Sequence, residues 1–132
     1  MKLNLDCCRD VLFFLEDNLT ITDDFETESV SIHDVISALD KYKPGELANT
    51  LLVLEEAGFI ISDDFHSDDS IEDIIIDRIT YNGYQFIESV RPETVWNKVK
   101  NIGLKIGSFS IDTASQIAVG VITALINAQL GL

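Results

Sequence analysis

The chain has 132 residues, which is enough for one small domain and a short appendage. A hydrophobic content of 46%, with seven Gly and two Pro, excludes a disordered chain. The formal net charge of −14 at pH 7 disfavours nucleic acid as a ligand, because Lys and Arg at phosphates supply most of that affinity.

Charge is distributed unevenly, with a change at about residue 90. Residues 1–90 hold 21 of the 23 acidic residues and five of the nine basic ones, a net charge of −16. Residues 91–132 hold two acids and four bases, a net charge of +2. We therefore expect an acidic domain over residues 1–90 and a helical extension, with an apolar last helix, over residues 91–132.

The first predicted helix covers about residues 6–18, where apolar residues recur at helical spacing. Within it, Cys7 and Cys8 are expected to be free, buried hydrophobic residues, as suits a reducing cytoplasm. Asp6 interrupts the apolar stretch that a signal peptide would need. We therefore expect a cytoplasmic protein.

The next segment is predicted to be a loop, a short strand and two helices. Residues 20–28, rich in acids, are expected to form a solvated loop before a strand at residues 30–32. A second helix ends near residue 40, and Pro44 opens a third that ends near residue 57. Their inward faces are predicted to carry Val35, Ile36 and Leu39 in the second helix and Leu47, Leu51 and Leu54 in the third.

A hairpin and further helices are predicted to follow. Gly58 lies where a left-handed helix cap is expected. Residues 59–61 and 74–79 are predicted strands, and residues 63–73 between them, with six acids, a loop. Thr80 caps a fourth helix and Pro92 opens a fifth. The inward residues are predicted to be Tyr84, Ile87 and Val90 in the fourth helix and Val95, Val99, Ile102 and Ile106 in the fifth, with Trp96 in the core.

This order of helix, short strand, two helices, hairpin and helix is typical of a winged helix. The sequence therefore predicts a mainly α chain with a small β-hairpin (α+β). We expect a winged-helix-like domain followed by C-terminal helices.

Four motifs along the chain have a recognisable spacing. They are Met1-Lys2-Leu3-Asn4-x-Asp6-x-x-Arg9-Asp10-x-Leu12, Leu54-x-x-Ala57-Gly58-x-Ile60, Ile79-Thr80-Tyr81-x-Gly83-x-x-Phe86-Ile87 and Arg91-x-x-x-Val95-Trp96-x-x-Val99-Lys100. Together they resemble an uncharacterised bacterial and prophage family, a domain of unknown function with the number 2513. The resemblance covers nearly the whole length and implies a phage or prophage setting, without a known activity or assigned functional residues. The tail departs from the pattern, because family tails are more charged.

The charges on the predicted third helix and wing distinguish between DNA and protein as the partner. The outward face of that helix is predicted to carry Glu46, Asn49, Val53 and Glu56, without any Lys or Arg. The predicted loop over residues 63–73, which would be the wing of a winged helix, contributes Asp63, Asp64, Asp68 and Asp69. Because both surfaces would meet phosphates with carboxylates, we interpret them as a protein-interaction surface. Two interpretations of the acids remain open. They could imitate the phosphate backbone of a nucleic acid and bind a basic groove on the partner, or they could only keep the loop solvated.

No motif for catalysis or metal binding is recognisable. His33 and His66 lack partners at zinc-ligand spacing. Residues 63–73 lack the Gly and terminal Glu of an EF-hand, which leaves a weak loop-based Ca²⁺ site as the alternative. We therefore expect no enzymatic activity, no cofactor and no metal.

The last predicted helix runs from Ser108 or Ser110 to about residue 129. Three alternatives are open for what surrounds its apolar side. No charge follows Asp112, so the helix could span a bilayer. It could pack on its own domain, or a second copy could cover its broad apolar side. We favour the second copy, since polar residues form one narrow stripe along the helix. The self-association residues would then be Ile117, Val121, Ala124, Leu125 and Ala128.

The leading hypothesis is a non-enzymatic, phage- or prophage-type protein-interaction module that self-associates through its last helix. Its partner would be an unknown host or phage protein, for example a host defence or nucleic-acid-handling protein that it antagonises. The first alternative is a winged-helix DNA-binding transcriptional regulator, which would need Lys41, Lys43, Arg78 and bases from a neighbouring subunit. The second alternative is a membrane-anchored factor held by the last helix.

Overall fold

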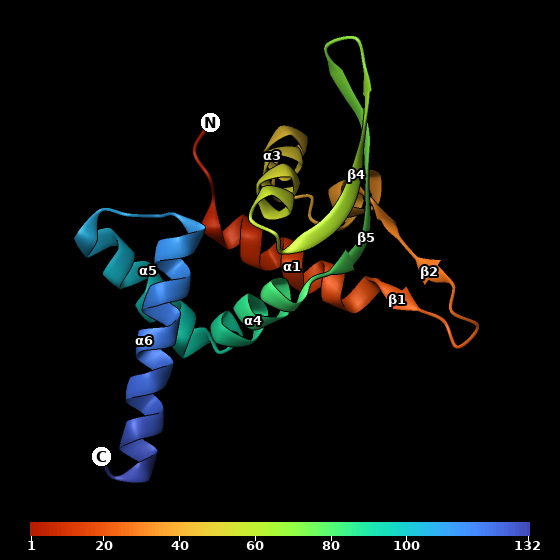
Figure 1. Cartoon of the computed structure of the whole chain (residues 1–132). Coiled ribbons are helices and arrows are strands. Elements are labelled where there is room, and N and C mark those ends of the chain that lie inside the picture. The colour runs from red at the N-terminus through yellow and green to blue at the C-terminus, as the bar shows by residue number, and fades with distance from the viewer. The chain divides into compact units, whose positions relative to one another are not determined.

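The computed structural model describes residues 1–132 and contains six helices and two small antiparallel sheets (Figure 1). This confirms the predicted α+β class. The chain forms two compact units, Met1–Tyr84 and Gln85–Leu132. The division lies inside helix α4 (Tyr81–Val90), whereas the charge pattern placed it after residue 90.

Helix α1 (Leu5–Asn18) begins where the Asn4 side chain accepts a hydrogen bond from the backbone N–H of Cys7, at 3.2 Å. Apolar residues at helical spacing bury one side of this helix. Cys7 and Cys8 are free thiols and fully buried, as the sequence predicts.

Residues 20–28 form a small hairpin, where the sequence predicted a plain loop. Strand β1 (Thr20–Ile21) pairs antiparallel with β2 (Thr27–Glu28). Between them, the Thr22 hydroxyl accepts a backbone hydrogen bond at 3.0 Å, and Phe25 has a positive φ of 66°. Because both strands are short and exposed, they lack the alternation of buried and exposed residues by which a strand is recognised.

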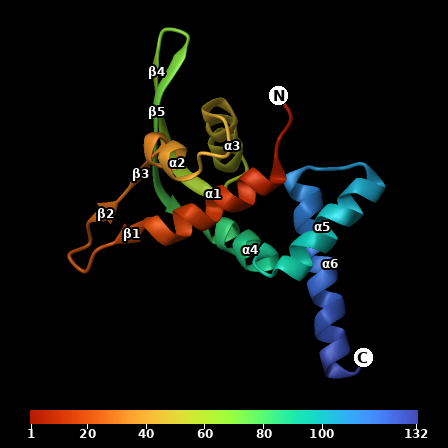
Figure 2. The same cartoon turned by 180° about the vertical axis from the view of Figure 1, so that it is seen from behind.

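The main sheet has three antiparallel strands in the order β3-β5-β4. They are β3 (Val30–Ser31), β4 (Ile60–Ser67) and β5 (Ser70–Ile79). Helix α2 (Ile32–Ala38) lies against β3 and β5, as Figure 2 shows from behind. It is short, so Val35 is fully buried while Ile36 and Leu39 are only half-buried.

Helix α3 (Pro44–Glu56) contacts α1, α2 and β4. Its predicted inward residues, Leu47, Leu51 and Leu54, are all fully buried. They form one stripe of the core of the first unit, together with apolar residues of α1 and the sheet.

The prediction of a loop over residues 63–73 is wrong, because these residues form most of a long hairpin. Strands β4 and β5 stay paired as far as Ser67 and Ser70, which leaves Asp68 and Asp69 as the turn. Asp68 has a φ of 52°, in the left-handed region that Asp tolerates better than most residues. Two register shifts interrupt the pairing, so the alternation of apolar residues that would reveal the strands is broken.

A close backbone contact joins the ends of four elements in the first unit. Gly58 ends α3 with a φ of 77°, the left-handed cap that the sequence predicts. The Thr80 hydroxyl donates to the Gly58 carbonyl at 2.5 Å and accepts from the N–H of Gly83 at 3.1 Å. A Cβ atom on Gly83 would overlap the Phe59 carbonyl oxygen and lie 2.7 Å from the Ile79 side chain. The start of α4 can therefore approach β4 this closely only because residue 83 is a glycine and has no side chain.

The second unit contains the end of α4, then α5 (Glu93–Ile106) and α6 (Ile111–Leu130), and α5 packs against α6. Gly107 and Gly131 end these two helices with left-handed caps. Trp96 is 1% exposed, in agreement with its predicted place in the core.

Three residues predicted to be inward lie at the surface. Tyr84 is 44% exposed, and the neighbouring helical position Phe86 is buried instead. Ile102 and Ile106 are 36% and 60% exposed, because the last two turns of α5 present this side to solvent. The buried side of α5 runs from Val95 through Val99 to Gly103 instead.

The glycine contact yields a stability prediction. Gly83→Ala is expected to lower the free energy of unfolding by about 1–3 kcal/mol, since the added methyl group must displace backbone. Gly45→Ala is the matched control, because a Cβ atom there meets nothing within 4 Å. It should be neutral or raise stability by up to about 1 kcal/mol. Urea unfolding of both variants measures this, and equal stabilities would contradict the close approach.

Candidate functional site

The outward face of α3 offers less surface than the sequence predicts. Of its four predicted interaction residues, Glu56 is exposed, whereas Glu46, Asn49 and Val53 are half-buried. The helix contacts α1, α2 and β4, which accounts for this partial burial. Its most accessible part is therefore the C-terminal end, at Glu56.

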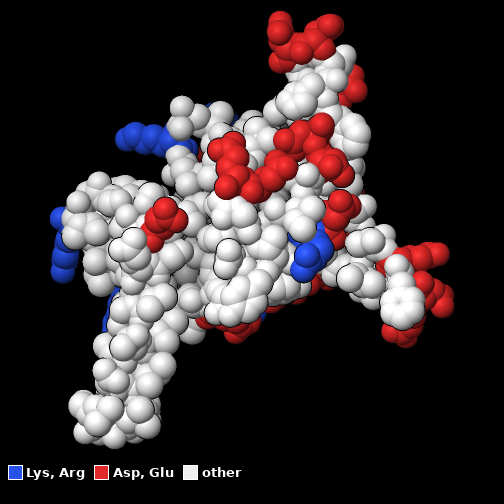
Figure 3. All heavy atoms as spheres, in the orientation of Figure 1, with Lys and Arg blue, Asp and Glu red and all other residues white.

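The four aspartates predicted to share an acidic loop are spread along the hairpin. Asp68 and Asp69 are exposed at the turn. Asp63 and Asp64 are neighbours in β4, so their side chains point to opposite sides of the hairpin. Figure 3 shows acidic side chains at the hairpin tip and a separate acidic patch over α3 and the lower part of the hairpin. The negative charge thus forms several patches and not one continuous track.

One polar cluster, which the sequence analysis missed, lies between the end of α3 and the start of β4. It consists of Glu55, Ser62 and Asp64. Glu55 is in the last turn of α3, and alternation along β4 puts Ser62 and Asp64 on the same side as the buried Ile60. Burial raises the pKa of Glu55, the Asp64 carboxyl raises it further, and the Ser62 hydroxyl lowers it. The three side chains are therefore close enough to influence one another.

Two oxygens of this cluster, Ser62 Oγ and Asp64 Oδ1, are buried without a hydrogen-bond partner. The Ser62 hydroxyl affects the pKa of Glu55, but the contact lacks the geometry of a hydrogen bond. A signal for this cluster was present in the sequence. Ser62 and Asp64 are polar residues in phase with the apolar Ile60, at positions where a strand should bury its side chains.

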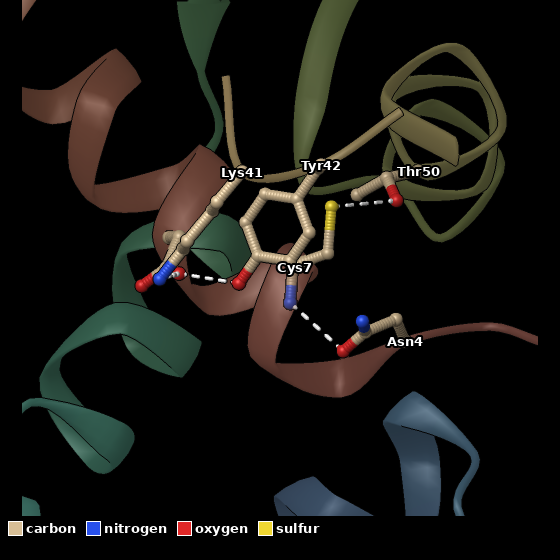
Figure 4. Close-up of polar contacts among 6 residues, drawn as sticks. Asn4, Cys7, Lys41, Tyr42 and Thr50 are labelled. Carbon is tan, nitrogen blue, oxygen red and sulfur yellow. Dashed lines mark hydrogen bonds and ion pairs between the residues drawn. The ribbon is translucent and has the colours of Figure 1, made fainter. Parts of the chain in front are cut away.

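A second polar cluster joins α1 to the segment between α2 and α3 (Figure 4). The Tyr42 hydroxyl donates to Asp10 Oδ2 at 2.5 Å, and Lys41 Nζ lies 3.0 Å from the same oxygen. Nearby, the Thr50 hydroxyl contacts Cys7 Sγ at 3.3 Å. These bonds connect α1 both to the loop before α3 and to α3 itself.

The two thiols of α1 and the Tyr42 hydroxyl favour their neutral forms. Burial raises the pKa of the Cys7 thiol, and it raises that of Cys8 to about 12. Burial and the hydrogen bond to Asp10 raise the pKa of Tyr42. Because the thiolate is the reactive form of cysteine, neither thiol is activated as a nucleophile. We therefore assign this cluster a structural role.

An open pocket of about 350 Å³ lies beside the end of β5. It is lined by Leu19, Thr20, Ile21, Asp77, Arg78, Ile79 and Tyr84. The outward position of Tyr84, which the sequence analysis missed, places its ring at this pocket. Arg78 contributes the single basic group of the lining, with the acid Asp77 next to it in the chain.

The predicted self-association residues differ in exposure along α6. Ile117 and Val121 are half-buried in the second unit, whereas Ala124, Leu125 and Ala128 are exposed. Every residue from 123 to 132 is exposed. The large apolar side chains in this stretch are between 46% and 87% exposed, namely Leu125, Ile126, Leu130 and Leu132. The end of α6 is therefore not covered by the rest of the second unit.

No group of three or more His, Cys, Asp or Glu side chains is placed to hold a metal ion. His33 Nε2 lies 3.2 Å from the backbone carbonyl oxygen of Glu72, so one ring nitrogen of His33 is engaged with the hairpin. His66 is an exposed residue of β4.

The second cluster yields a stability prediction. Tyr42→Phe is expected to lower the free energy of unfolding by about 1.5–3 kcal/mol, since it removes a hydrogen bond to the Asp10 carboxylate. Tyr81→Phe, at a tyrosine that is 74% exposed, is the matched control and should be neutral. Thermal unfolding of both variants measures the difference. Identical melting temperatures would contradict the role of the Tyr42–Asp10 bond.

Comparison with known families gives a match over most of the chain. Residues 2–110 match the family described as hypothetical protein (DUF2513). No curated protein and no solved structure matches, so the winged-helix interpretation stays a prediction. The matched part ends at Ser110, the N-cap of α6, and thus leaves α6 outside. Because the match covers most of the chain, the chain belongs to the DUF2513 family.

Proposed function

We propose that this chain is a non-enzymatic protein-interaction module that self-associates through α6 and binds a second protein of the host or the phage. The single observation that carries the proposal is the uncovered apolar end of α6. The acidic surface of the first unit supports the second part, the choice of a protein partner.

The uncovered end of α6 needs a partner to be stable in water. It extends over residues 123–132, which are all exposed. An isolated helix of this length is marginal in water, and most helical stability in proteins comes from tertiary packing. Leu125, Ile126 and Leu130 would each gain from burial, by about 1.5–3 kcal/mol for a fully covered side chain. Self-association supplies that burial.

A second copy suits the composition of α6. Asp112, Gln116, Thr123 and Asn127 lie along one narrow polar stripe, which can face water while the apolar remainder is covered. Gly120 is exposed, and a Cβ atom there meets nothing within 4 Å, so its own chain does not require this glycine. A glycine in mid-helix costs about 0.5–1 kcal/mol relative to Ala, and it permits close approach of another helix.

A membrane is the second candidate for covering α6. The helix is 20 residues long and, by length and composition, apolar enough to cross a bilayer, with 17% of its most apolar window buried. Against this candidate, Gln116, Thr123 and Asn127 would enter the hydrocarbon region. We therefore rank self-association first and place the protein in the cytoplasm.

The acidic first unit favours a partner with a basic surface. Glu55 and Glu56 end α3, and the hairpin adds six aspartates and Glu72, so phosphate groups would be repelled from this side. The bases that a DNA-binding alternative needs are dispersed. Lys41 is paired with Asp10, and Arg78 lies at the pocket beside Asp77. For these reasons we prefer a basic protein surface to DNA.

The proposal predicts the oligomeric state of two variants. Wild-type protein should elute as an oligomer, and Leu125→Glu should elute as a soluble monomer, because the charge enters the apolar side of α6. Thr123→Glu, on the polar stripe, is the matched control and should keep the oligomer. Size-exclusion chromatography with light scattering measures the masses.

Two outcomes would contradict self-association. One is a monomeric wild type that floats with liposomes, which would favour the membrane candidate. The other is an unchanged mass for Leu125→Glu.

A further inference from the structure

We propose that Glu55, Ser62 and Asp64 form a binding site for Ca²⁺ between the end of α3 and strand β4. This proposal departs from the sequence analysis, which expected no metal and placed its weak Ca²⁺ alternative in a loop over residues 63–73. It concerns the first unit alone and does not depend on the function proposed for α6.

The backbone brings oxygen ligands from two elements to one place. Strand β4 directs Ser62 and Asp64 to the side on which Ile60 is buried. Helix α3 packs against β4 and ends with Glu55 and Glu56, of which Glu55 is half-buried. The Asp64 carboxyl and the Ser62 hydroxyl both alter the pKa of Glu55, so the three side chains converge.

An unpartnered, buried hydroxyl inside the cluster points to a polar or charged ligand at this place. Ser62 is only 8% exposed, and its Oγ atom has no hydrogen-bond partner. Asp64 Oδ1 is likewise buried and unpartnered. A buried polar atom without a partner costs about 1–3 kcal/mol, and such atoms in folded proteins usually contact water or an ion. A cation among these oxygens would satisfy both atoms.

Electrostatics favour a cation over a neutral group. Neither Glu55 nor Asp64 forms an ion pair with a basic residue. The last turn of α3 has no basic residue, so the negative end of its dipole adds to the field of the carboxylates. Asp63, on the opposite side of β4, raises the pKa of Glu55 further. The site therefore lacks any internal positive charge.

The ligand set fits Ca²⁺ better than other metals. All three groups offer oxygen, which excludes the nitrogen and sulfur coordination that zinc prefers. Ca²⁺ accepts irregular geometry and incomplete protein coordination, whereas Mg²⁺ demands a near-ideal octahedron. Two carboxylates and one hydroxyl are fewer than the ligands of a tight site, so water must complete the shell. We therefore expect a dissociation constant for Ca²⁺ on the order of 1 mM, similar to that of the weak Ca²⁺ sites in extracellular protein modules.

The test is thermal unfolding of the full chain at constant ionic strength, with CaCl₂ replacing NaCl. About 10 mM Ca²⁺ should raise the melting temperature of the wild type by about 5 °C. Asp64→Asn and Glu55→Gln should each lose most of this rise. Asp68→Asn, which removes the same charge from the exposed hairpin turn, is the matched control and should keep it.

A second measurement locates the ion and remains informative if a variant folds poorly. In ¹H–¹⁵N spectra of the wild type, Ca²⁺ should shift the amides around Glu55 and from Ser62 to Asp64 in a saturable way. An equal melting-temperature rise in all variants, or shifts spread over every acidic patch, would overturn the proposal in favour of general screening. The absence of any Ca²⁺ effect would overturn it as well, and would leave a shared proton or water as the partner of these oxygens.

Discussion

The contact between the Phe59 carbonyl and the backbone at Gly83 is the constraint on which the first unit depends. Thr80 adds a hydrogen bond to each side of this contact, to the carbonyl of Gly58 and from the N–H of Gly83. As a result, the end of α3, the start of β4, the end of β5 and the start of α4 meet at one point. The direction of the hairpin follows from this junction, and so does the approach of β4 to α3. The Glu55–Ser62–Asp64 cluster exists because these two elements are held together.

Negative charge has more than one role in this chain. At the hairpin tip, exposed carboxylates sit on strands whose outer edges are unpaired, and charged side chains on such edges oppose aggregation. At the end of α3, the Glu55 carboxylate lies half-buried beside an unpartnered hydroxyl, and burial together with the nearby Asp64 carboxyl raises the pKa of Glu55. The structure thus separates acids that serve solubility from acids that are candidates for binding. Composition alone does not distinguish these groups.

Local sequence signals predicted the helices well and the hairpin poorly. The stripe of Leu47, Leu51 and Leu54 and the left-handed cap at Gly58 both depend on the chemistry of residues close together in the sequence. The strands over residues 63–73 were missed because register shifts break the alternation and because Asp is unfavourable in strands. The convergence of α3 with β4 depends on tertiary packing, so no local pattern could place Glu55 beside Asp64. For α6, the sequence pattern indicated an apolar helix. Which part of that helix is exposed could be seen only in the structure.

The proposed function depends most on what covers the apolar end of α6. This helix lies beyond the residues that match the family, and its last ten residues are exposed in the second unit. The most direct measurement is amide hydrogen exchange over residues 123–130 as a function of protein concentration, without lipid. Self-association predicts that these amides become protected as concentration rises, because a second copy stabilises the helix. Rapid exchange that stays the same at every concentration would contradict it.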